Sequence, residues 1–127
     1  MKEDLGYAGE LSHPKILPKI SIRYLGLLSR FHKINANHQY KIAVVLSGPE
    51  PQRTILEHII IREFQNIDFP VLFVRGLPTE SETMLLKNKN IEVHNHLSSE
   101  ELSIAMQESE FVLSRSGYST IMDLIAI

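Results

Sequence analysis

The sequence predicts an α/β fold in which parallel strands form one sheet with helices on its faces. Short apolar runs rich in β-branched residues alternate along the chain with segments whose apolar residues recur at three- and four-residue spacing. The run KIAVVLSG is continuously apolar, as expected of a strand that is covered on both faces. With 127 residues, the chain is long enough for one domain with its own hydrophobic core.

Two of the predicted strands are short apolar runs that end at a glycine. The clearest is KIAVVLSG, which Gly48 closes, and VLFVRG closes in the same way at Gly76. The five predicted strands cover residues 22–26, 41–48, 71–76, 91–96 and 111–115. Residues 1–20 are expected to be irregular, because Pro14 and Pro18 interrupt any helix there.

Three helices are predicted, and they cover residues 51–65, 98–109 and 116–127. Pro51 suits a first helical turn, and the run SSEE at the start of the second helix indicates a capping box. The residues expected to face the sheet are Ile55, Leu56, Ile59, Ile60 and Phe64, then Leu102, Ala105 and Met106, then Ile121, Leu124 and Ile125. Residues 77–90 are polar, with at most a single turn near residues 82–87.

The composition excludes several classes of function. The chain is 43% hydrophobic and 22% charged, as is ordinary for a globular protein, and its net charge of -2 argues against nucleic-acid binding. The absence of cysteine excludes disulfides, thiolate zinc sites and a cysteine nucleophile. No apolar run approaches the roughly 20 residues of a spanning helix, and the charged start is not a signal peptide. The cytoplasm is therefore the expected compartment.

Ligands of open parallel sheets bind beyond the carboxyl ends of the strands. Three predicted turns lie there, at residues 47–53, 95–101 and 114–120. The last carries the run SRSGYST directly after a buried strand and at the start of a helix. The first N–H groups of a helix have no intrahelical partner, and together with the helix dipole they attract a phosphate.

The glycine and hydroxyl residues of this turn suit a phosphate site. Gly117 lets a ligand approach the backbone, and Ser116, Ser119 and Thr120 add hydroxyl donors. The alternative is that these hydroxyls only cap the helix, because serine and threonine are preferred at caps for that reason alone.

Asp123 lies four residues after Ser119 and three after Thr120, so the three share one helix face. An acid in this place can accept hydrogen bonds from ribose hydroxyls. The usual dinucleotide-binding arrangement carries that acid on the next strand instead. The alternative for Asp123 is a surface acid exposed to solvent.

The sequence indicates neither a metal site nor a catalytic residue. His94 and His96 point to one face of a predicted strand, but no third ligand has a fitting spacing, and zinc sites need three or four protein ligands. The run GYS is not a nucleophile elbow, and no Ser-His-Asp set can be assembled.

The closing segment, SRSGYSTIMDLIAI, resembles the nucleotide-sugar motif of the C-terminal domain of glycosyltransferase family 28. That family includes the N-acetylglucosaminyltransferase of peptidoglycan synthesis, and its motif reads approximately Ser/Cys-Arg-Ser/Ala-Gly-x-x-Thr-x-x-Glu-hydrophobic. RYLGLLSRF resembles the segment that links the two domains of the family, and VVLSGPEPQRTILEHI its first strand, loop and helix. VHNHLSSEELSIAMQESEFVLSRSG resembles the strand, base-binding loop, helix and strand before the motif.

This resemblance, which runs from residue 22 to the end, implies a Rossmann-like parallel sheet with helices on both faces. Such a domain is the C-terminal half of a glycosyltransferase with the GT-B fold, and it holds a UDP-sugar while the N-terminal domain holds the acceptor. Residues 22–127 would be part of this donor domain, and residues 1–21 a remnant of the interdomain segment. Neither a cofactor nor a metal is implied, because the helix N-terminus can neutralise the charge of the diphosphate.

The resemblance also implies roles for individual residues. Gly117 and its neighbours would face the diphosphate, and Asp123 stands where the family has a ribose-binding glutamate of longer reach. His96 and Leu97 occupy the loop whose backbone reads the uracil edge, and Arg53 matches a basic residue after the first loop. The residues expected to bind the nucleotide sugar are Ser47, Gly48, Arg53, His96, Leu97, Arg115, Ser116, Gly117, Ser119, Thr120 and Asp123.

The first loop, SGPEPQR, departs from the family pattern, which is often rich in glycine and serine. Pro49 and Pro51 remove two N–H donors, and Glu50 would repel a diphosphate. Direct phosphate contact by this loop is therefore not the expected arrangement, and its remaining candidates are Ser47, Gly48 and Arg53.

The family motif continues beyond its match here with a Gly-x-Pro turn and a further strand. The chain is therefore expected to be a fragment of a larger hexosyltransferase and to be inactive alone, with the catalytic base in the absent domain. The alternatives are a non-catalytic nucleotide-sugar-binding module that acts with a partner chain, and part of a GT-B sugar-nucleotide epimerase. Expected partners are a UDP-sugar, an acceptor bound by the absent domain, a membrane surface for the parent, and a second copy at the truncated edge.

Overall fold

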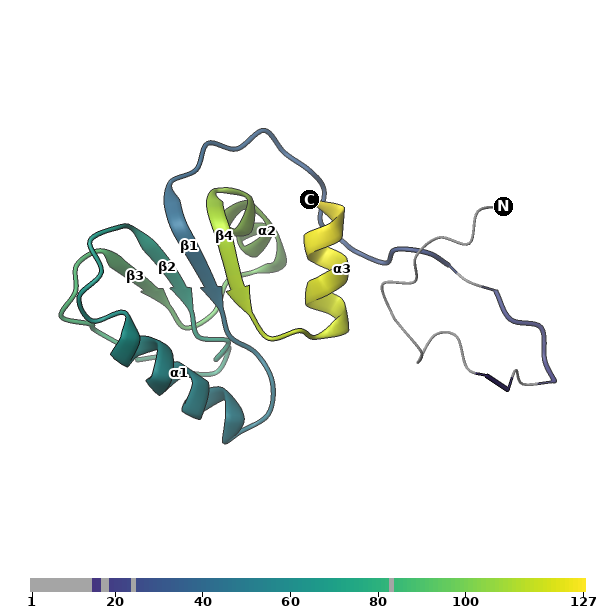
Figure 1. Cartoon of the computed structure of the whole chain (residues 1–127), viewed down its shortest axis with the longest axis horizontal. Helices are drawn as coiled ribbons and strands as arrows, with labels where there is room; N and C mark the ends of the chain where they lie inside the picture. The colour runs from purple at the N-terminus through teal and green to yellow at the C-terminus, as the bar shows by residue number, and fades with distance from the viewer. Residues whose placement is uncertain (1–14, 17–18, 24, 83) are drawn as a thin grey trace.

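The protein forms one parallel sheet with helices on both of its faces (Figure 1). The structure is a computed structural model, and it describes residues 15–16, 19–23, 25–82 and 84–127. Its elements are β1 (Tyr40–Val45), α1 (Gln52–Glu63), β2 (Val71–Val74), β3 (Ile91–His94), α2 (Ser99–Gln107), β4 (Ser109–Ser114) and α3 (Tyr118–Ala126). The predicted α/β, Rossmann-like fold class is thereby confirmed.

The order of the strands is β3-β2-β1-β4, and every neighbouring pair is parallel. The chain runs from β1 outward through β2 to β3, and α2 then returns it to the other side of β1, where β4 pairs. The strands that follow β1 directly thus lie on one side of it, and β4 lies on its other side. This reversal is the topological switch point at which open α/β sheets bind their ligands.

The helices α1 and α2 cover opposite faces of the sheet, as Figure 1 shows. On one face, Ile60 of α1 packs with Val44 and Phe73 in a buried cluster. On the other face, Met106 of α2 packs with Ala43 and Val45. Alternate residues of β1 thus enter opposite cores, which explains why this strand is apolar at successive positions.

The predicted strand at residues 22–26 does not form. Residues 22, 23, 25 and 26 are irregular, and residue 24 lies outside the described part of the chain. Leu25 is 77% exposed, and Gly26 has a φ of +79°, a left-handed conformation that ends an extended run. The single turn expected at residues 82–87 is also absent from the described residues of that stretch.

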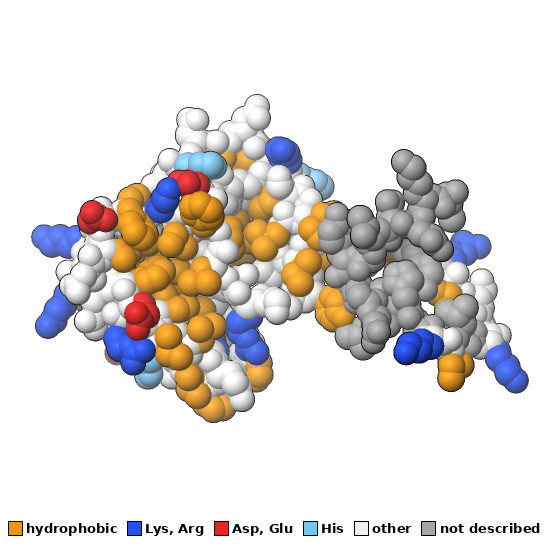
Figure 2. Space-filling model, viewed as in Figure 1, with side chains coloured by type: hydrophobic (Ala, Val, Ile, Leu, Met, Phe, Trp, Pro, Cys, Tyr) orange, Lys and Arg blue, Asp and Glu red, His pale blue; other side chains and the backbone are white. Residues whose placement is uncertain are grey.

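Several residues expected to face the core lie at the surface instead. Ile55 and Ile59 of α1 are 54% and 44% exposed, and no residue of α3 is buried. Phe111 and Leu113 of β4 are also exposed, because no helix in the described part of the chain covers them on the α1 side of the sheet. Figure 2 shows hydrophobic side chains along α1 and over the neighbouring part of this face. By contrast, Leu102, Ala105 and Met106 of α2 face the core as predicted.

Gly76 is the position at which a side chain would disturb the fold most directly. Its φ is +73°, and a Cβ there would lie 2.2 Å from the backbone oxygen of Leu46, whose own N–H is bonded to Val74. We expect Gly76→Ala to lower the free energy of unfolding by more than about 2 kcal/mol, measured by urea denaturation. Gly26→Ala is the control, because Gly26 has a similar φ and no atom of the described residues lies within 4 Å of the point where its Cβ would be. Equal losses in the two variants would show that the contact with Leu46 has no influence.

Candidate functional site

The structure joins two of the predicted ligand-binding turns at the switch point. Val45, at the end of β1, pairs in register with Ser114, at the end of β4. One residue beyond β4, the Nη1 group of Arg115 donates a hydrogen bond of 3.2 Å to the carbonyl oxygen of Ser47. Gly48 lies directly beneath this guanidinium group, since a Cβ at Gly48 would be 1.9 Å from Nη1.

We call Ser47, Gly48, Arg115 and Gly117 the switch-point cluster. The left-handed φ of +108° at Gly48 and the lack of a side chain there are what let Arg115 lie across the β1 loop. The residues that the structure describes include no carboxylate in an ion pair with Arg115. The cluster therefore presents a positive side chain whose charge is not neutralised by a neighbouring acid of the described chain.

The helix α3 begins beside this cluster without a side-chain cap. Its N-cap is Gly117, in an extended conformation, and none of the three hydroxyl side chains of this turn forms a cap hydrogen bond at that end. The alternative in which Ser116, Ser119 or Thr120 caps the helix is therefore wrong. A glycine N-cap has no side chain of its own, so it leaves room for an anion at the positive end of the helix.

The other two helices each have an acidic side chain near the N-terminus. In α2, Ser98 and Glu101 form the predicted capping box, with the Glu101 carboxylate accepting from the Ser98 N–H at 2.7 Å. In α1, the Glu50 carboxylate accepts from the N–H of Thr54 at 3.1 Å. Hydrogen bonds from Arg53 and then Thr54 lower the pKa of Glu50, so this carboxylate is ionised at neutral pH. Of the helices in the described chain, α3 is thus the one whose N-terminus suits an added anion.

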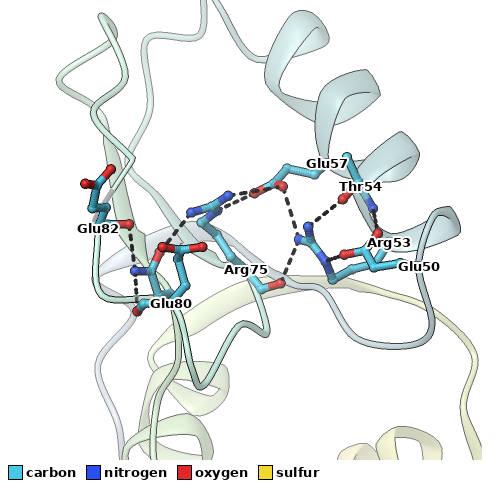
Figure 3. A network of polar contacts seen from close by, with 8 residues as sticks. Glu50, Arg53, Thr54, Glu57, Arg75, Glu80 and Glu82 are labelled. Carbon is cyan, nitrogen blue, oxygen red and sulfur yellow. Dashed lines mark hydrogen bonds and ion pairs between the residues drawn. The ribbon is translucent and has the colours of Figure 1, made fainter.

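Arg53 lies in a buried polar network and not in the switch-point cluster (Figure 3). Its guanidinium donates to Glu50, Glu57, Thr54 and the carbonyl oxygen of Arg75. These four bonds direct its donors to protein groups, and its side chain is buried. The structure thus gives Arg53 a structural position, while its predicted ligand contact remains a prediction.

Glu57 is the centre of this network and is only 1% exposed. It accepts hydrogen bonds from Arg53 of α1 and from Arg75, one residue beyond β2. Arg75 also donates to the side-chain oxygen of Asn95, whose amide in turn donates to the carbonyl oxygens of residues 80 and 82. The network joins the loops that follow β1, β2 and β3, as Figure 3 shows, and so holds them at this edge of the sheet.

Asp123 is bound to a segment far away in the sequence. Its Oδ1 atom accepts a hydrogen bond of 2.6 Å from the Oγ of Ser29, and the Ser29 Oγ accepts from the N–H of Phe31. The alternative in which Asp123 is a solvent-exposed surface acid is therefore wrong, because the side chain is partly buried against this segment. No local pattern in the chain indicates this contact.

His96 and Leu97 follow β3 at the opposite edge of the sheet from β4. Strands β2 and β1 lie between them and the switch-point cluster. Leu97 packs against the buried cluster that contains Leu72 and Ala105. The structure therefore does not bring these two residues together with Arg115 and Gly117, and their predicted contact with a base remains a prediction.

A third polar group, which sequence reasoning missed, lies on the α2 side of the sheet. The Tyr40 hydroxyl donates to Glu92 at 2.7 Å, and the Nε2 atom of His94 lies 2.7 Å from the other oxygen of Glu92. The hydrogen bond from His94, and then the one from Tyr40, lower the pKa of Glu92. Among the described residues, no group of three or more His, Asp or Glu side chains is placed to hold a metal ion.

Burial, followed by the hydrogen bond to Glu92, raises the pKa of Tyr40 to about 12. Because this value lies above the unfolded-state value of about 10, the contribution of the neutral phenol to stability is complete below pH 10 and disappears as the pH rises to 12. We expect an absorbance titration to show one of the four tyrosines ionising late, and Tyr40→Phe to remove that step. A wild-type titration with all tyrosines ionising near pH 10 would contradict this assignment.

Two hollows of the described surface lie away from the switch point. One, of about 420 Å³, is bordered by Ile61, Leu85 and Asn88, and the other, of about 460 Å³, by Arg30, Ser99 and Ile104. No helix in the described part of the chain is long and apolar enough to cross a membrane. The candidate site lies at the carboxyl edge of the sheet, and its ligand would lie across that edge.

Three comparisons with known proteins do not assign this chain to a family. A scan against protein-family models, a search of curated proteins and a search of solved structures each found no match. The resemblance to glycosyltransferases therefore rests on the residues of the chain itself.

Proposed function

We propose that the chain is the donor-binding unit of a glycosyltransferase and holds the diphosphate of a UDP-sugar at the switch-point cluster. The observation that carries the proposal is the glycine N-cap of α3 close to Arg115, whose charge no carboxylate of the described residues neutralises. A diphosphate carries the negative charge that both groups attract. The position of this pair between the ends of β1 and β4 adds support, because ligands of such sheets bind there.

The parts of the ligand follow from this placement. The diphosphate lies against Gly117 and the first turn of α3, with Arg115 beside it. The ribose lies toward Asp123, which is on the same helix face as Ser119 and Thr120. The choice of uracil as the base comes from the resemblance of the closing segment to the nucleotide-sugar motif. A comparison of UDP with ADP tests this choice.

The chemistry that these groups serve is the departure of the diphosphate. In the proposed transfer, an acceptor hydroxyl attacks the anomeric carbon and gives its proton to a general base, while the bond from that carbon to the diphosphate breaks. Negative charge develops on the leaving oxygen, where the helix N-terminus and Arg115 stabilise it. The acceptor and the base belong to another part of the enzyme in this proposal, so the chain alone binds the donor without turnover.

The experiment is a calorimetric titration of the folded chain with UDP and with ADP. We expect UDP to bind more tightly than ADP, and Asp123→Ala to weaken UDP binding by about 10-fold through loss of charge-assisted hydrogen bonds to the ribose. Asp68→Ala is the matched control, because Asp68 is an exposed acid that precedes β2, at the amino end of the strands. Failure of the wild-type chain to bind UDP, or equal affinity for ADP, would overturn the proposal.

A further inference from the structure

The hydrogen bond between Ser29 and Asp123 joins residues that are 94 positions apart in the sequence. A serine hydroxyl has one proton to donate, and the Ser29 Oγ already accepts from the N–H of Phe31 at 3.0 Å. Its proton is therefore directed to Oδ1 of Asp123, at 2.6 Å. Such a bond to an ionised carboxylate is stronger than one between neutral groups.

Ser29 is held in place by the packing of the residues that follow it. Phe31, two positions later, is 4% exposed and packs with Val45, Met106 and Ile127. Gln107 of α2 fixes the next residues, accepting from the N–H of Ile34 and donating to the carbonyl oxygen of His32. The hydroxyl of Ser29 is thus positioned by a buried anchor and two backbone contacts.

This contact occupies only one side of the Asp123 carboxylate. Within the described part of the chain, Ser29 is its one hydrogen-bonding partner, so Oδ2 keeps its acceptor capacity. The bond also fixes the side-chain torsions of Asp123 before a ligand arrives. An acceptor that is already oriented binds a hydroxyl at a smaller entropic cost than a freely rotating one.

We infer that Ser29 is a positioning residue for the ribose: it holds Asp123 so that Oδ2 accepts from the ribose hydroxyls of the bound nucleotide. This inference rests on the proposed function, since it assumes that a nucleotide lies at the switch-point cluster. It makes the segment around Ser29 part of the donor site, although this segment lies outside the sheet and its helices.

The test compares UDP with a uridine diphosphate analogue that lacks both ribose hydroxyls. We expect Ser29→Ala to weaken UDP binding roughly 3- to 10-fold, as for loss of a charged hydrogen bond, and to change binding of the analogue by less than about 2-fold. The ratio of the affinity for UDP to the affinity for the analogue should therefore become smaller in this variant. Ser29→Thr keeps the hydroxyl and should keep the wild-type ratio of the two affinities. Ser21→Ala, at an exposed serine earlier in the chain, should also leave this ratio unchanged.

The outcomes separate this inference from the proposed function. If wild-type protein binds UDP but Ser29→Ala leaves its affinity unchanged, or weakens both ligands equally, Ser29 has no positioning role while the donor site stands. If folded wild-type protein binds neither ligand, both proposals fail. Thermal unfolding of each variant shows whether its fold is intact, and a Ser29→Ala chain that is unfolded is replaced in the comparison by Ser29→Cys, whose thiol is a weaker donor.

Discussion

Replacement of Glu57 by glutamine is expected to lower the free energy of unfolding by about 3 kcal/mol or more. Glu57 is fully buried and is the shared acceptor of two guanidinium groups, those of Arg53 and Arg75. Glutamine has the same shape but no charge, so Arg75, which is only slightly exposed, would lose its counter-charge, while Arg53 would keep Glu50 as its partner. An uncompensated buried charge costs far more than a lost surface pair.

Chemical denaturation with urea measures this effect, and α1 supplies its own control. Glu63 lies on the same helix and pairs with Arg62, but both side chains are more than 60% exposed. We therefore expect Glu63→Gln to change stability by less than about 0.5 kcal/mol. Similar losses in the two variants would mean that the network around Glu57 does not stabilise the fold.

Replacement of Arg115 by methionine is expected to weaken UDP binding by at least about 10-fold. Methionine keeps much of the length of the side chain and removes the charge that lies over Gly48 and at the Ser47 carbonyl. Because the Arg115 side chain donates a single hydrogen bond within the described chain, to the exposed residue Ser47, its loss should have little effect on stability. The change should therefore be confined to the ligand.

Titration calorimetry at two salt concentrations measures this second effect. The difference between wild type and Arg115→Met should shrink at high salt, as expected for an exposed charge. Arg62→Met, at the far end of α1, is the control for a general change in net charge. An Arg115→Met chain that binds UDP as wild type does would exclude this residue from the site.

The sheet could be predicted well from the sequence because its central strands are covered on both faces. In β1 and β2, successive residues enter two different cores, so the apolar run is continuous and easily recognised. The order of the strands could not be predicted, since it depends on how α2 crosses the sheet. The strand expected at residues 22–26 was wrong because residues 22, 23, 25 and 26 pair with no strand of the described sheet, and Leu25 is exposed.

The candidate site was predicted in part, and the missing part consists of long-range contacts. Arg115 and Gly117 lie in a local motif that can be read along the chain. The Ser29 contact of Asp123 could not be predicted, because 94 residues separate the partners. Glu57 resembles an ordinary surface acid in the sequence, and its four-residue spacing from Arg53 was the only local signal of the buried pair.

An NMR titration of the isotope-labelled chain with UDP would locate the donor site residue by residue. We expect the largest changes in amide chemical shift on residues 115–120 and on Gly48, where α3 begins beside the end of β1. The amides at the start of α1 and α2 should change little, because Glu50 and Ser98 already occupy those helix ends. Shifts centred on α1 or α2, or no shifts at saturating UDP, would contradict a donor site at the switch-point cluster.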